Sequence, residues 1–176
     1  MARSRRAWGW HQLDPRWAEL VVADARVGTG DLVIDVGAGL GALTRPLIEA
    51  GARVIAVEAH PGRAARLREC FGREVVVVTA DAGDLRLPRR PFHVVANPPF
   101  GISTALLERL VHPGSRLVEA HVVLQLQVAR RWARPDGSAA RRWRRTFQAE
   151  LGRPLPRSAF HPRPAVDSRV LVLRRR

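Results

Sequence analysis

The stretch LVIDVGAGLG, residues 32–41, decides the fold, because a run of five residues, apolar except for Asp35, ends in a turn with three glycines. A short, continuous apolar run rich in Val and Ile is typical of a strand that is buried on both faces of a sheet. Glycines directly after the strand permit a sharp turn and let a ligand approach main-chain N–H groups. The same letters also fit the GxGxxA turn of a nicotinamide-binding domain through Ala42, so the pattern alone leaves the nucleotide open.

Strand and helix signals alternate outward from this stretch. Helical patterns are expected at 16–26, 42–50, 61–71 and 103–111, and apolar strands at 53–58, 74–79 and 92–97. Residues 119–127 predict a fifth strand or a strand entering a helix. This order predicts an α/β fold with a mostly parallel sheet and helices on both faces. Residues 146–151 and 168–176 predict two more strands, joined by the proline-rich segment 154–167, that pair as an antiparallel hairpin at one edge.

Size and composition indicate one globular domain over residues 1–176, with 46% hydrophobic residues. The apolar runs are too short for a membrane-spanning helix, and the basic N-terminus lacks the apolar stretch of a secretory signal. A single cysteine, Cys70, excludes an intramolecular disulfide framework. The histidines show no ligand spacing, so no metal is expected. The expected location is cytoplasmic, and the expected state is a monomer.

The charge favours a polyanionic partner. All 30 basic residues are arginine, and the net charge is +14. Nucleic acid comes first and an anionic membrane surface is a distant second, because arginine forks onto phosphates and stacks on bases. Two segments are enriched in arginine: a basic arm at 1–12 and a segment at 128–145 that predicts a short helix followed by a basic loop. Trp132 and Trp143 in the second segment either stack on bases or anchor the loop to the core.

Two carboxylates follow expected strands, where open α/β sheets bind their ligands. Glu58 ends the second strand and can accept both hydroxyls of a ribose, although a lone acid there is also a common solvated cap. Asp81 follows the third strand and can accept a hydrogen bond from an adenine amino group. Asp84 competes for that role, and Asp81 is favoured because it lies nearer the strand end.

The most specific motif is Asn97-Pro98-Pro99-Phe100, at the end of the fourth strand. The prolines fix the backbone, so the Asn97 side-chain oxygen and the Pro98 carbonyl can accept hydrogen bonds from one amino group. Phe100 offers a flat face on which a base can stack. Two acceptors that hold the hydrogens of an adenine amino group let its nitrogen turn pyramidal, which exposes the lone pair to an electrophilic methyl. The motif therefore predicts methylation of a base amine.

Together these segments resemble a known family. DVGAGLG, Glu58, TAD, NPPFGIST and FHPRPAVDSRVLVLRR follow, in order and spacing, the Erm-type 23S rRNA adenine-N6 methyltransferases, relatives of the small-subunit dimethyladenosine transferases. The resemblance covers Trp10 to Leu173. It implies a Rossmann-like class I methyltransferase fold with a seven-stranded sheet, and S-adenosylmethionine as cofactor. It also implies an adenine of 23S rRNA, free or in an assembling large subunit, as target, and resistance to macrolide, lincosamide and streptogramin B drugs.

The resemblance also implies roles for individual residues. The family has Gln-Asn-Phe-Leu where residues 10–13 read Trp-His-Gln-Leu, and more often Tyr where Phe100 stands. The catalytic residues implied are Asn97, Pro98, Pro99 and Phe100. The cofactor-binding residues implied are His11, Leu13, Gly37, Gly39, Gly41, Glu58, Asp81, Ala82 and Asn97.

RNA contacts are expected in the arm and the 128–145 segment, because typical members continue into a small helical domain that grips RNA and this sequence ends at Arg176. The RNA-binding residues expected are Arg3, Arg5, Arg6, Arg130, Arg131, Arg134, Arg141, Arg142, Arg144 and Arg145. Three alternatives stay open: a small-subunit rRNA methyltransferase, a DNA adenine methyltransferase, and a non-catalytic RNA-binding assembly factor.

Overall fold

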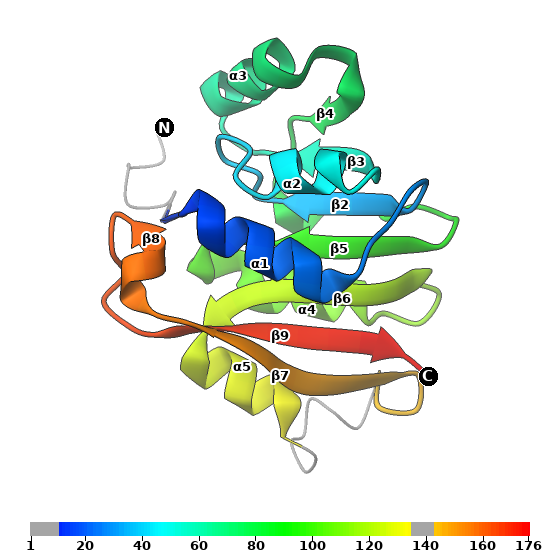
Figure 1. Cartoon of the computed structure of the whole chain (residues 1–176). Helices are drawn as coiled ribbons and strands as arrows, with labels where there is room; N and C mark the ends of the chain where they lie inside the picture. The colour runs from blue at the N-terminus through cyan, green and yellow to red at the C-terminus, as the bar shows by residue number, and fades with distance from the viewer. Residues whose placement is uncertain (1–10, 135–142) are drawn as a thin grey trace, which may run out of the picture.

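The computed structural model describes residues 11–134 and 143–176, and its centre is a seven-stranded sheet with the order β4-β3-β2-β5-β6-β9-β7 (Figure 1). Strands β2 to β6 are parallel, and β9 runs antiparallel between β6 and β7. The strands are β2 (Leu32–Val36), β3 (Arg53–Val57), β4 (Val75–Val78), β5 (Phe92–Ala96), β6 (Leu117–Gln125), β7 (Phe147–Leu155) and β9 (Ser168–Arg175). The predicted α/β fold with a C-terminal antiparallel hairpin is confirmed.

Helices cover both faces of this sheet (Figure 1). Buried side chains of three helices form one core cluster with one face, and those of two others form a second cluster with the opposite face. The first group is α1 (Pro15–Ala25), α2 (Thr44–Glu49) and α3 (Pro61–Phe71), and the second is α4 (Ser103–Leu110) and α5 (Leu126–Ala133). No helix among residues 11–134 and 143–176 is long and apolar enough to cross a membrane.

Strand β2 is the pivot of the topology. All five of its residues are buried, as expected for a strand with parallel neighbours on both sides and helices on both faces. Chain order reverses here, since β3 and β4 lie on one side of β2 while β5 and β6 lie on the other. Open α/β sheets bind ligands at the carboxyl ends of the strands at such a switch point. The fold therefore brings Gly37, after β2, and Asn97, after β5, to one place.

The N-terminal strand was not predicted from the sequence. Strand β1 (Gln12–Leu13) pairs antiparallel with β8 (Phe160–His161) in a separate two-stranded sheet. Strand β7 also runs further than expected, through Pro154 to Leu155, with a register shift after Leu151. The end of the 1–12 arm is thus a paired strand, and the proline-rich connection between β7 and β9 is partly strand. This pairing places the N-terminal segment at the carboxyl ends of the parallel strands (Figure 1).

The arginine-rich segment begins with the short helix that was predicted. Residues up to Ala133 belong to helix α5, and Arg130 and Arg131 lie on it. Trp132 and Trp143 are each 4% exposed, and their rings stack on each other with centroids 5.5 Å apart. Both indoles therefore anchor the segment to the core, and neither presents a free face to a base. Residues 135–142 lie outside the described residues.

Candidate active site

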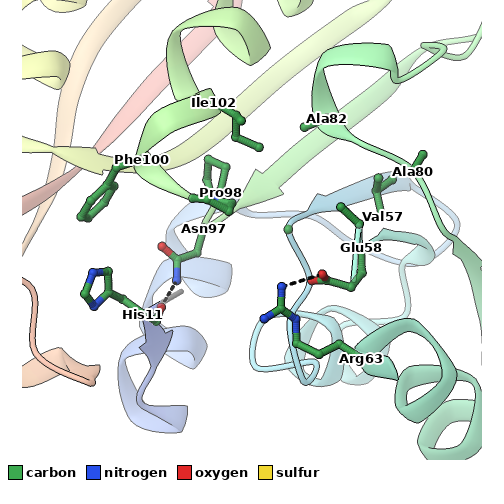
Figure 2. Close-up of a pocket in the computed structure, with 13 residues that line it drawn as sticks. His11, Val57, Glu58, Arg63, Ala80, Ala82, Asn97, Pro98, Phe100 and Ile102 are labelled. Carbon is green, nitrogen blue, oxygen red and sulfur yellow. Dashed lines mark hydrogen bonds and ion pairs between the residues drawn. The ribbon is translucent and has the colours of Figure 1, made fainter. Parts of the chain in front are cut away.

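A cavity lies at the carboxyl ends of the central parallel strands (Figure 2). Its two ends differ in chemistry. Glu58 and Arg63 lie at one end, His11 and Phe100 lie at the other, and Asn97 lies between them (Figure 2). The lining residues are His11, Gly37, Val57, Glu58, Ala59, Arg63, Ala80, Ala82, Asn97, Pro98, Pro99, Phe100 and Ile102. Most of the residues predicted from the glycine turn, the acid at the end of β3 and the Asn-Pro-Pro-Phe motif are thus gathered around one space.

Gly37 allows the glycine turn and the Asn-Pro-Pro-Phe motif to pack together. Its φ is +77°, and a Cβ at this position would lie 3.1 Å from Pro98 Cα and 3.2 Å from Pro99 Cδ. A larger residue would be strained by its own backbone and would push the proline turn away. The glycine therefore sets the distance between the two motifs.

The Asn97 amide has a fixed orientation. Its Nδ2 donates to the main-chain carbonyl of His11, at 2.8 Å (Figure 2). Because the nitrogen is engaged, Oδ1 is the atom that the amide offers as an acceptor toward the cavity. The His11 ring stacks on the Phe100 ring, with centroids 5.5 Å apart, and the ring Nδ1 of His11 lies 2.7 Å from the carbonyl of Pro162. His11, the residue directly before β1, thus contacts both the amide and the aromatic ring of the motif.

Glu58 is not a solvated cap, because its side chain is only 3% exposed. Its Oε2 accepts from the N–H of Gly39 at 2.9 Å. Its Oε1 accepts from the N–H of His60 at 2.7 Å and from Arg63 Nη2 at 2.8 Å. A carboxylate has about four acceptor positions, so these three donors leave one for a ligand. Arg63 was not among the residues expected at this site, although the expected helix at 61–71 puts it on the first turn after Glu58.

A second, smaller cavity adjoins the first, and Gly37 and Asn97 line both. Its other lining residues are Gln12, Leu13, Asp35, Ala38, Gly39, Leu40, Ala42 and Leu43. Asp35 is fully buried, and its Oδ2 accepts from the Thr44 hydroxyl at 2.6 Å. Its Oδ1 has no hydrogen-bond partner among the described residues. Desolvation by burial raises the pKa of Asp35 to about 7. This cavity therefore contains a buried carboxyl oxygen without a partner beside the Asn-Pro-Pro-Phe motif.

This pKa predicts how stability depends on pH. A group whose pKa is higher in the folded state stabilises the protein below its unfolded pKa, and that contribution disappears as the pH rises through the folded value. For Asp35 the window runs from 3.8 to about 7. We expect Asp35→Asn to gain roughly 2–3 kcal/mol in unfolding free energy relative to the parent protein between pH 5 and pH 8. Urea unfolding of both proteins at the two pH values measures it, and a constant difference would contradict the raised pKa.

Two predicted cofactor residues line neither cavity. Gly41 has a φ of +89°, and a Cβ there would lie 2.5 Å from Phe71 Cε2. A glycine is therefore required at this position for packing against α3. The partly buried carboxylate of Asp81 accepts from the N–H of Gly83 at 2.8 Å, at the start of the 3-10 helix η3 (Ala82–Asp84). In the segment after β4, Ala80 and Ala82, on either side of Asp81, line the first cavity. A role of Asp81 toward adenine stays a prediction.

The predicted RNA-binding arginines lie in different places. Arg130 and Arg131 are exposed on α5, and Arg131 Nη2 lies 3.4 Å from the Thr104 hydroxyl, just beyond the Asn-Pro-Pro-Phe motif. Arg144 Nη2 donates to the carbonyl of Arg134 at 3.0 Å, and Arg145 is exposed. The predicted arginines outside the described residues are Arg3, Arg5, Arg6, Arg141 and Arg142. In the described part of the chain, no group of three or more His, Cys, Asp or Glu side chains is placed to hold a metal ion.

Comparison with known proteins identifies relatives over nearly the whole chain. The chain is 39% identical over 150 residues to an rRNA adenine N-6-methyltransferase of Corynebacterium diphtheriae, which covers 84% of this chain and 59% of that protein. It is 38% identical over 152 residues to the mycinamicin-resistance protein MyrB of Micromonospora griseorubida, with 84% of this chain and 48% of that protein covered. Further relatives include small-subunit rRNA methyltransferases. The chain spans about half to three-fifths of the length of these curated relatives.

A solved structure of an rRNA methyltransferase also matches this fold. The crystal structure of the 23S rRNA methyltransferase ErmE matches with a TM-score of 0.83 and 30% identity, over 93% of this chain and 68% of ErmE. The family model described as ribosomal RNA adenine dimethylase matches residues 12–176, which include the glycine turn, Glu58 and the Asn-Pro-Pro-Phe motif. With this match and the site that those segments build, the chain belongs to the ribosomal RNA adenine dimethylase family.

Proposed function

We propose that this protein transfers methyl groups to N6 of an adenine in 23S rRNA, at the macrolide-binding region of the large subunit. The observation that carries the proposal is the Asn97 amide. Its nitrogen is engaged by the His11 carbonyl, so its oxygen is left to accept a hydrogen bond from an amino group in the cavity. Phe100 lies beside it as a stacking surface. An exocyclic amine on a flat base fits both features.

The methyl donor is S-adenosylmethionine, as the family and the methyltransferase fold imply. The residues present fit this molecule. Val57, Ala80, Ala82 and Ile102 give a largely apolar wall for an adenine, and Glu58 retains an acceptor position for ribose hydroxyls. The buried, unpartnered Oδ1 of Asp35 can accept from the ammonium group of the methionine part. When bound, the cofactor supplies a sulfonium-activated methyl group as the electrophile.

The protein's own residues prepare the nucleophile. An adenine inside a helix is out of reach, so the target must leave its stack and enter the cavity. There Asn97 Oδ1 and the Pro98 carbonyl hold the two hydrogens of N6, and the lone pair is released from the ring. Phe100 fixes the plane of the base. The rate enhancement then rests on positioning and on fixed dipoles directed at the charge that develops on N6.

The choice of 23S rRNA is supported by the ErmE match and by the resistance function in the name of MyrB. Methyl groups at that adenine would obstruct macrolide, lincosamide and streptogramin B drugs, so the proposed role is resistance in the cytoplasm. A second candidate is methylation of small-subunit rRNA, which relatives at 36% identity favour.

One experiment separates the candidates. Labelled S-adenosylmethionine is incubated with naked 23S rRNA, 16S rRNA and duplex DNA, side by side, with Asn97→Ala as the inactive control. We expect label in N6-methylated adenine of 23S rRNA alone. Label in 16S rRNA alone would transfer the proposal to the second candidate. No label in any substrate, with cofactor binding intact, would identify a non-catalytic RNA-binding protein.

The arginine-rich segment gives a salt-dependence prediction. Each phosphate contact by an arginine releases counterions, so affinity for RNA falls with salt. We expect the quadruple change of Arg141, Arg142, Arg144 and Arg145 to alanine to weaken rRNA binding. The slope of log K against log salt should flatten by roughly 3 units, if all four contact phosphates. Titration of an rRNA fragment at several salt concentrations measures both effects, and cofactor binding should not change.

A matched control removes the same charge elsewhere. Arg53, Arg73, Arg90 and Arg116 are exposed and lie at the amino ends of the parallel strands, away from the cavity. Their replacement by alanine should lower affinity less and leave the slope nearly unchanged. Equal slopes for the two quadruple variants would mean that the segment carries general surface charge and no specific RNA contacts.

A further inference from the structure

We infer that His11 is the base that takes the proton released from N6 of the target adenine, which adds a residue to the machinery of the proposed function and rests on that function. The family resemblance implied a cofactor-binding role for His11, at a position where other members have asparagine. Three contacts of His11 define its place. Its carbonyl accepts from Asn97, its ring stacks on Phe100, and its Nδ1 lies 2.7 Å from the Pro162 carbonyl.

The contact with Pro162 fixes which ring nitrogen is basic. A carbonyl oxygen can only accept a hydrogen bond, so Nδ1 of His11 must carry a hydrogen. In the neutral ring Nε2 then carries the lone pair. The ring lines the cavity on the side of Phe100, opposite Glu58 and Arg63 (Figure 2). A neutral His11 thus presents a proton acceptor at the end of the cavity where the target base is proposed to stack.

The other titratable residues that line this cavity are less suited to the task. Glu58 already accepts from Gly39, His60 and Arg63, on the opposite side of Asn97. Arg63 has no acceptor atom and stays charged. Within the described lining, His11 is therefore the side chain with an uncommitted basic nitrogen. It is also partly exposed, so it can pass the proton on to water.

The reaction replaces a carbon–sulfur bond by a carbon–nitrogen bond and moves one proton from N6 to His11. The N6 lone pair forms the bond to the methyl carbon, and the carbon–sulfur bond breaks with its electron pair left on sulfur, which becomes a neutral thioether. As this bond forms, positive charge develops on N6, and in the same step one of its two hydrogens leaves as a proton to His11 Nε2 while its bonding pair stays on N6. The imidazolium gives the proton to water, which restores the neutral ring.

Two substitutions test this role, because the hydrogen bond to Asn97 comes from the main chain of His11 and survives both. His11→Asn keeps an N–H that can reach the Pro162 carbonyl but has neither an aromatic ring nor a base. His11→Phe keeps a ring on Phe100 but has no hydrogen bond to Pro162 and no base. We expect both variants to lose roughly 100-fold in single-turnover methyl transfer, the lower end of what a positioned base supplies.

The pH dependence separates a base from a structural support. The parent enzyme should lose more rate than either variant as the pH falls, because a protonated imidazole cannot accept the N6 proton. Three titratable residues lie on the adjoining segments: His161, Arg163 and Asp14, the last of which caps α1. Glu58 and Arg63 lie across the cavity. Burial raises the pKa of Asp35, beside Asn97 in the second cavity, to about 7, and the part of the pH dependence that Asp35 contributes is the same in the parent and in both variants.

Binding measurements complete the experiment. An rRNA fragment with fluorescent 2-aminopurine at the target reports entry of the base, and calorimetry reports S-adenosylhomocysteine binding. Under the proposal, both affinities of the variants stay within about threefold of the parent. Full activity of His11→Phe would show that the ring only supports Phe100, and full activity of His11→Asn would show that only the bond to Pro162 matters. Either result overturns the proposal, whereas absence of activity in the parent protein would instead overturn the proposed function.

Discussion

Replacing Asn97 with alanine is expected to reduce methyl transfer by about 100-fold or more, the effect of removing one positioned hydrogen bond to a reacting group. The amide lies between Glu58, at the end of the cavity proposed for the cofactor, and Phe100, at the end proposed for the target, and its Oδ1 is the acceptor proposed for N6. Alanine removes that acceptor and also the bond from Nδ2 to the His11 carbonyl. Single-turnover transfer of labelled methyl to an rRNA fragment measures the loss.

Two controls keep this result interpretable. Calorimetry with S-adenosylhomocysteine and thermal unfolding should show that Asn97→Ala still binds cofactor and still folds. Asn97→Asp retains an oxygen at the Oδ1 position but places a second oxygen against the His11 carbonyl, so it should also be strongly impaired. Near-normal turnover of Asn97→Ala would remove the two-acceptor mechanism, and normal turnover of Asn97→Asp would show that the bond to His11 is dispensable.

The central sheet and the motifs at its strand ends were predictable from the sequence, because each is marked by a local pattern of residues. A general rule of sheet topology then says where those patterns meet. The apolar runs at β2, β3 and β5 identify buried parallel strands, and the carboxyl ends of parallel strands meet at one edge. Gly37, Glu58 and Asn97 were therefore expected to gather although the sequence separates them widely. The structure confirms this and shows in addition that Glu58 is buried.

The parts that escaped prediction depend on contacts that leave no local pattern. Strand β1 has two residues, too few for a periodicity, and its partner β8 lies near the other end of the chain. The position of His11 over Phe100 follows from that pairing and cannot be inferred from residues 10–13 alone. The sequence leaves open whether Trp132 and Trp143 stack on bases or anchor the segment, and only the folded chain shows that they stack on each other in the core.

The environment of Asp35 could not be predicted from the sequence for a different reason. In the sequence, Asp35 is an acidic residue in an otherwise apolar strand, like the acid of many ligand-binding motifs. The sequence does not show how deeply its side chain is buried. The structure places it fully inside, with one oxygen bonded to Thr44 and the other unpartnered, and burial raises its pKa to about 7. A buried carboxyl without a full set of partners costs stability unless a ligand or a proton supplies one. This is typical of a group kept for binding rather than for folding.

Glu58→Ala is expected to weaken binding of S-adenosylhomocysteine by roughly 1.5–3 kcal/mol, the value of hydrogen bonds to a charged group. This corresponds to an increase of about 10- to 150-fold in Kd. The carboxylate has one acceptor position left after Gly39, His60 and Arg63, and the ribose hydroxyls are its proposed partner. Titration calorimetry of parent and variant gives the change directly.

The structure adds a second way for this variant to lose affinity, because Glu58 also ties the glycine turn to the start of α3 through Gly39 and Arg63. A cofactor analogue that lacks both ribose hydroxyls separates the two. If Glu58 binds the ribose, the analogue binds the parent protein weakly and loses little more in Glu58→Ala, so the two changes are strongly non-additive. If the carboxylate only holds the turn, both ligands lose the same factor in affinity in the variant.

Arg63→Met removes the ion pair but leaves the carboxylate and its backbone donors. It should weaken binding of S-adenosylhomocysteine much less than Glu58→Ala does. An equal loss would place the main effect in the Glu58–Arg63 pair and not in the ribose contact.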